Sequence, residues 1–175
     1  FAGDMLTAHR AATQHVAAHA MQPVTTTFDV VITSNSGYPL DQNLYQAVKG
    51  MSAAAQIVKP GGDIIIAAEC CDGIPAHGEY GRLLREATSV QELLSTIRAP
   101  GFRCHDQWEV QIQAQIQQKA RVHVYASGLT DAQLAEAMVN PCHSVEACLA
   151  EILAGKPSAR VAVLPEGPQT IPYLV

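Results

Sequence analysis

Four polar side chains within two helical turns could form half of a binding site for a small anion. At positions i, i+3, i+4 and i+7 of one helical face stand Gln42, Tyr45, Gln46 and Lys49. An ammonium group is a charged donor for a carboxylate, and an amide one turn away offers both a donor and an acceptor. An ordinary solvated helix face would show the same spacing, so the pattern alone leaves both interpretations open.

Three other groups of residues could carry chemistry. Trp108, the single tryptophan, is either a core anchor or a flat contact for a cofactor or partner. The stretches 69–72 and 77–79 hold carboxylates and a histidine that could form an acid/base set, although their spacing is undefined. His15 and His19 could share a metal, but no third ligand stands nearby, so we interpret them as surface histidines and expect no metal site.

Composition excludes several classes of protein. A net charge of -5 provides no basic surface for nucleic acid, and no apolar run reaches the length of a membrane span. The five cysteines are odd in number, irregular in spacing and without a CxxC pair, which favours reduced thiols in a cytoplasmic protein. Because the chain starts at Phe1 without a signal sequence, we expect a piece of a longer protein.

Alternating strands and helices predict an α/β fold. The expected strands are 28–34, 63–69, 121–127 and 159–167. The expected helices are 1–21, 44–58, 82–98 (with a possible break near Thr88–Ser89), 107–119, 130–139 and 144–156. This order predicts a single domain over 1–175, with a leading helix over 1–21 and a sheet-containing core over 28–175. The core is expected to be a three-layer, Rossmann-like sandwich with a mainly parallel sheet of four or more strands and helices on both faces.

Ligands in such sheets bind beyond the carboxyl ends of the strands. Four loops meet this condition: 34–41, 69–80, 127–130 and 165–168. The polar helix face begins directly after the first loop, so its first turns should point toward the ligand crevice. Neither GxGxxG nor GxxxxGK[ST] occurs, which makes a nucleotide-dependent oxidoreductase a weak alternative. Asp106 and Glu109 resemble a capping box at the start of the helix that carries Trp108.

Long motifs add a family resemblance. The stretch SNSGYPLDQNLYQAVKGM, followed by KPGGDIIIAAECCDGIP, resembles the C-terminal domain of the nickel-dependent lactate racemase family, and HDQWEVQ and VAVLPEGPQTIPYL fit the same pattern. The likeness covers most of the chain. It implies an isomerase with its active site between two domains, of which this chain is the substrate-clamping C-terminal half and is inactive alone.

The resemblance also implies roles for single residues. Lys49 would bind the substrate carboxylate, Gln46 and Tyr45 would orient the substrate, and Trp108 would contact the cofactor. The missing N-terminal domain would hold the nickel-pincer nucleotide and the histidine bases, so no catalytic base is expected here. The implied reaction takes a hydride from the α-carbon of a 2-hydroxy acid and returns it to the opposite face, which racemises or epimerises the substrate.

Without the resemblance, the same residues fit a non-catalytic α/β ligand-binding or interaction module. The chain has no self-contained nucleophile and base, which favours that alternative. Its expected partners under the racemase hypothesis are a small 2-hydroxy acid and the N-terminal domain, with neither nucleic acid nor membrane. An exposed cleft face would also allow a homodimer.

Overall fold

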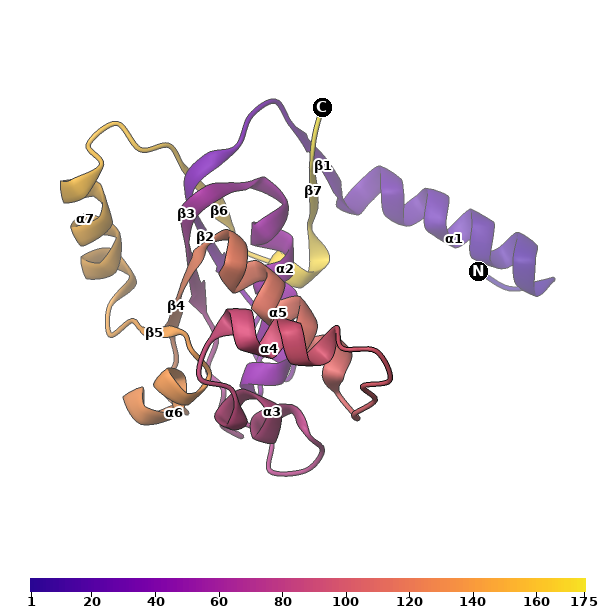
Figure 1. Ribbon diagram of the computed structural model, residues 1–175. Coiled ribbons are helices and arrows are strands. Elements are labelled where there is room, and N and C mark those ends of the chain that lie inside the picture. Colours follow the sequence, from indigo (N-terminus) through magenta and orange to yellow (C-terminus); the bar gives the residue numbers. More distant parts are fainter.

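A five-stranded parallel sheet forms the centre of the computed structural model, which describes residues 1–175 (Figure 1). In sheet order the strands are β5 (Asn140–Pro141), β4 (Arg121–Tyr125), β3 (Val58–Ala67), β2 (Phe28–Ser34) and β6 (Val161–Leu164). Every neighbouring pair is parallel. The predicted α/β class with a mainly parallel sheet is therefore confirmed.

Helices cover both faces of this sheet. They are α2 (Leu44–Ile57), α3 (Tyr80–Glu86), α4 (Val90–Ile97), α5 (Gln107–Lys119), α6 (Asp131–Glu136) and α7 (Val145–Gly155), while α1 (Met5–Ala20) stands apart. Helix α7 lies on the opposite side of the sheet from α2 and α5 (Figure 1). The predicted three-layer arrangement is thus confirmed.

The strands bury both faces because their apolar residues are continuous. Val31, Ile64 and Ile66 point into the main core of 28 buried residues beneath α2 to α6. Val30 and Ile65, one position along each strand, pack in a smaller core against α7. Alternation along a strand sends successive side chains to opposite faces, so an unbroken β-branched run suits a sheet covered on both sides.

The helix expected over 82–98 breaks at the predicted place near Thr88–Ser89 into α3 and α4, with Ser89 accepting a hydrogen bond from the Glu92 amide at 3.2 Å as the cap of the second. Other elements differ from the predictions. A separate parallel pair, β1 (Met21–Val24) and β7 (Ile171–Leu174), was not predicted. Each of these strands is four residues long, and their pairing joins segments about 150 positions apart, which local sequence does not reveal.

Helix α1 has no buried residue and extends away from the sheet (Figure 1). The Asp4 carboxylate caps it by accepting a hydrogen bond from the Thr7 amide at 3.0 Å. The helix is therefore stabilised by local interactions rather than by packing on the core. None of the helices has both the length and the apolar character required to cross a bilayer.

A buried carboxylate ties the amino-terminal ends of β3 and β4 to the end of α7. Asp63, whose side chain is 1% exposed, accepts hydrogen bonds from Arg121 at 2.7 and 2.8 Å and from Lys156 at 3.3 Å, and pairs with His123 at 3.0 Å. Burial alone would raise the pKa of Asp63, but the bonds from Arg121 and His123 outweigh it and lower the pKa from 3.8 to about 2.

Candidate functional site

The loops that follow the strands meet at one edge of the sheet, as predicted. The Cys70 amide donates to the Asp41 carbonyl at 2.9 Å, and the Gly128 amide donates to the Glu69 carbonyl at 2.8 Å. The Ser34 hydroxyl donates to the Pro165 carbonyl. Hydrogen bonds therefore join all four loops into one platform. Gly37 and Gly73 have the positive φ values, 74° and 65°, expected of them.

Helix α2 begins at this platform. Its N-cap is Asn43, whose side chain accepts a hydrogen bond from the Gln46 amide at 3.0 Å. An apolar stripe on the other side of this helix faces the sheet, since Leu44, Val48 and Met51 are fully buried. The polar face is therefore turned outward, at the carboxyl end of the strands.

Close packing sets the position of α2 beside its lysine. The Gly50 amide donates to the buried Asn35 side chain at 2.9 Å. A Cβ at Gly50 would lie 2.5 Å from the Ser34 carbonyl oxygen, and a Cβ at Gly167 would lie at the same distance from that atom. Both glycines let backbone segments approach more closely than any other residue would allow.

Gln46 and Lys49 form one polar unit on this helix. The Lys49 ammonium is exposed and donates a hydrogen bond to the Gln46 side-chain oxygen. Tyr45 is half-buried, and its ring packs edge-on against Tyr80 with 5.3 Å between centroids. Lys49 thus faces solvent, Gln46 beside it is half-buried, and Tyr45 joins them to the interior.

Trp108 is not a core anchor, because half of its surface is exposed. It stands in the first turn of α5 and makes an edge contact with the His105 ring at 5.4 Å. It lines a shallow hollow with His105 and Gln111. A half-exposed indole of this kind can stack on a flat ligand.

The predicted residues surround three adjoining hollows rather than one cavity. Tyr45 and Gln46 line a cavity of about 700 Å³ that also contains His77 and His105. Lys49 lines another, of about 440 Å³. His105 belongs to both the first cavity and the hollow of Trp108, and α2 packs against α5, so the four predicted residues lie on two neighbouring helices.

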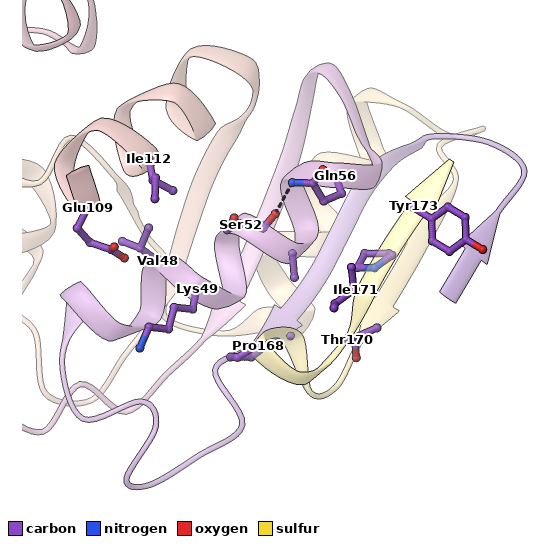
Figure 2. Close-up of a pocket in the computed structure, with 13 residues that line it drawn as sticks. Val48, Lys49, Ser52, Gln56, Glu109, Ile112, Pro168, Thr170, Ile171 and Tyr173 are labelled. Carbon is purple, nitrogen blue, oxygen red and sulfur yellow. Dashed lines mark hydrogen bonds between the residues drawn. The ribbon is translucent and has the colours of Figure 1, made fainter. Parts of the chain in front are cut away.

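The cavity beside Lys49 runs along α2 toward β7. Figure 2 shows Lys49 and Glu109 near one end and Ile171 and Tyr173 near the other. Apolar side chains form much of the wall between them, among them Val48 and Ile112. Within this wall the ammonium of Lys49 and the carboxyl group of Glu109 are the charged groups.

The capping box expected at α5 is absent. Asp106 has a left-handed φ of 63°, forms no side-chain cap bond, and instead accepts a hydrogen bond from the Glu79 amide at 2.9 Å. Glu109 is free of the capping role for this reason. Its residue is only 7% exposed, and its carboxyl group sits at the α2–α5 junction beside Lys49 (Figure 2).

Sequence reasoning missed Glu109 as a site residue because it assigned the side chain to local capping. The only sequence signal was its place directly after Trp108. Burial raises the pKa of the Glu109 carboxyl group, and the Lys49 ammonium opposes that effect. The Glu109 carboxyl group therefore interacts with Lys49 rather than with the amino end of α5.

The carboxylates and the histidine of 69–72 and 77–79 do not come together in one acid/base site. Asp72 and His77 line the larger cavity, but Glu69 does not, and the Glu79 carboxylate pairs with Arg82. In the amino-terminal helix, the His19 ring nitrogen lies 2.7 Å from the His15 carbonyl oxygen, so that ring is engaged with its own helix.

No group of three or more His, Cys, Asp or Glu side chains is arranged to hold a metal ion. All five cysteines are free thiols, of which Cys70 and Cys142 are buried. Burial raises the pKa of Cys70 to about 12, with the nearby Asp41 carboxylate adding to the effect, so this thiol stays protonated and unreactive.

Comparison with known proteins yields consistent matches. A family model described as the lactate racemase C-terminal domain matches residues 24–171. The lactate racemase of Thermoanaerobacterium thermosaccharolyticum is 39% identical over 147 residues, which cover 82% of this chain and 34% of that protein. The lactate racemase of Lactiplantibacillus plantarum is 36% identical over 170 residues, which cover 95% of this chain and 40% of that protein.

Solved structures agree. The lactate racemase apoprotein from T. thermosaccharolyticum superimposes with a TM-score of 0.86 at 34% identity, covering 94% of this chain and 40% of that one. A Thermotoga maritima crystal structure with a TM-score of 0.60 at 10% identity covers 97% and 42%, and shares the fold alone. The chain spans about 34% to 42% of the proteins that it matches.

Proposed function

Since the chain belongs to the lactate racemase C-terminal domain family, we propose that it is the substrate-clamping domain of a racemase or epimerase acting on 2-hydroxy acids. The observation that carries the proposal is the pair formed by the exposed Lys49 and the half-buried Gln46 at the carboxyl edge of the sheet. The rest of the enzyme would close over this edge to form the active site.

Lys49 supplies the charge that holds the substrate. Its ammonium donates a charge-assisted hydrogen bond to the substrate carboxylate, and exclusion of water from a closed cleft strengthens that bond. Gln46, which already contacts the ammonium, offers an amide donor and acceptor for the substrate hydroxyl or carbonyl oxygen. Tyr45 supports this helix face through its packing on Tyr80.

The residues of this chain fit one side of a flat cofactor. Trp108 presents a half-exposed indole on the helix next to Lys49, which suits stacking on a planar ring. When bound, the nickel-pincer nucleotide supplies the redox chemistry at the substrate α-carbon. Its metal ligands, its tether and the histidine bases would come from the part of the protein outside this chain.

The test is Lys49→Ala in the full-length, cofactor-loaded enzyme. We expect kcat/KM for lactate to fall ~10²-fold or more, because the substrate carboxylate loses its charged donor. Lys59→Ala is the matched control, since Lys59 pairs with Asp29 at 2.8 Å at the amino end of β3, and should leave the kinetics unchanged. Equal kinetics for both variants would remove the proposed clamp.

A further inference from the structure

Glu109 is a buried acid at the junction of α2 and α5. Its residue is 7% exposed, and its carboxyl oxygens open into a cavity, since they are not among the fully buried polar atoms that lack a partner. It lines the same cavity as Lys49, to which it comes from α5 while the lysine comes from α2 (Figure 2). Lys49 and Glu109 are the two charged side chains of this cavity, so each is the counter-charge available to the other.

Three charged or titratable groups face this carboxyl group. Lys49 faces it from α2, Asp106 from the start of its own helix, and Tyr80 from α3. Burial raises the pKa of Glu109 most, Asp106 raises it further, and Lys49 lowers it. The Tyr80 pKa lies well above its ordinary value, chiefly through burial and then through Glu109, so Tyr80 stays neutral.

Lys49 is therefore the one cation that favours the ionised form of Glu109. It is not in contact with the carboxylate, because its ammonium donates to the Gln46 oxygen instead. An attraction across the cavity is easily overridden when a second anion arrives. A substrate carboxylate on Lys49 would offset the ammonium charge, bring a new negative charge close to Glu109, and displace the water that solvates it.

We propose that Glu109 is the internal counter-ion of Lys49, which balances the ammonium while the site is empty and takes up a proton from solvent when a substrate carboxylate replaces it. This inference rests on the proposed function of Lys49 and deepens it. Glu109 acts through Lys49 and is a positioning residue. Its protonation keeps the charge of the closed site constant, since one anion enters as another is neutralised.

By linkage, proton uptake and substrate binding must each promote the other. Substrate affinity should therefore rise as pH falls toward the range in which Glu109 titrates. This dependence would be absent if Glu109 only filled space between α2 and α5.

The experiment is calorimetric titration of the full-length, cofactor-loaded protein with lactate, in buffers of different ionisation enthalpy at pH 6 and pH 8. We expect the wild-type protein to take up a fraction of a proton per lactate bound, and more at pH 6 than at pH 8. Glu109→Gln should still bind lactate but lose this uptake. Glu136→Gln removes an exposed carboxylate on α6 and should retain it.

Equal proton uptake by the wild type and the Glu109→Gln variant overturns the inference while leaving the proposed function intact. Absence of lactate binding by the wild-type protein overturns the function itself, and the inference with it. Carbon-13 NMR of the Glu109 carboxyl group in the wild-type protein keeps the test independent of how the variant folds. A carboxyl signal that does not move toward the protonated form on lactate binding also overturns the inference.

Discussion

Gly50→Ala is a substitution for which local helix propensity and tertiary packing predict opposite outcomes. Gly50 stands inside α2, next to Lys49, where alanine would stabilise an isolated helix by about 1 kcal/mol. In the folded protein, however, the new Cβ would meet the Ser34 carbonyl oxygen at 2.5 Å and the Ile66 side chain at 3.0 Å. Ordinary contact begins at 3.4 Å, so one partner must move by about 0.9 Å.

The steric clash makes Gly50→Ala destabilising overall. The Ser34 oxygen belongs to the backbone of β2, which is held in the sheet and cannot rotate away. Overpacking of this kind costs about 1–3 kcal/mol, and the gain in propensity offsets only part of it. We therefore expect a net loss of up to about 2 kcal/mol in the free energy of unfolding. The relief of the clash moves α2 outward, and with it the ammonium of Lys49.

Gly155→Ala is the matched comparison. Gly155 is also helical, at the end of α7, and a Cβ there has no neighbour within 4 Å. Chemical denaturation of the two variants should show a destabilised Gly50→Ala and an unchanged or slightly stabilised Gly155→Ala. In the full-length enzyme, Gly50→Ala should also lower kcat/KM ~10- to 100-fold, because a displacement of about 1 Å in a substrate-binding group has effects of that size. If Gly50→Ala is as stable and as active as Gly155→Ala, the proposed role of close packing in placing Lys49 is refuted.

Two further predictions concern charge and the exposed indole. Asp63→Asn should destabilise the chain by about 2 kcal/mol at pH 7, since a difference of one in pKa is worth about 1.4 kcal/mol and the pKa of Asp63 falls from 3.8 to about 2 on folding. A carboxyl group with a lowered pKa stabilises the fold above pH 3.8 and loses that effect as pH falls through 2. Urea denaturation should therefore show that the free energies of unfolding of Asp63→Asn and wild type approach each other between these two pH values. A difference that stays constant with pH would contradict this role of Asp63. Trp108→Ala should change the free energy of unfolding by less than ~1 kcal/mol, because half of the residue is already in water. The same variant should weaken retention of the cofactor, measured as bound nickel in the full-length protein. A large loss of stability would instead make Trp108 a structural residue.

Much of the architecture could be predicted from local sequence. The β-branched run at 28–34 became a strand because such residues, buried on both faces, suit little else, and 121–125 became a strand with Val122 and Val124 buried in alternation with more exposed residues. The helices expected over 130–139 and 144–156 begin as α6 and α7 behind the N-caps Thr130 and Ser144, and Thr130 forms a capping box with Gln133. Strand propensity and helix capping depend on residues that are close together in the sequence, so they can be predicted without knowledge of the tertiary structure.

The site was only partly predictable for the same reason. The helical spacing of Tyr45, Gln46 and Lys49 placed them correctly on an outward face. The local pattern assigned Glu109 to a helix cap, whereas packing of α5 against α2 buries it beside Lys49. No short-range sequence signal predicts that Glu109 lies near Lys49, because the two residues are 60 positions apart in the chain.

The sequence by itself determined most of the helices, the longer strands of the sheet and which face of α2 is polar, since these depend on backbone propensity and on the period of apolar residues. Only the tertiary structure decided what faces Lys49, how close β2 comes to Gly50, and that β1 pairs with β7. Those features arise from contacts between distant segments. Their energies depend on distances that exist only after the chain has folded.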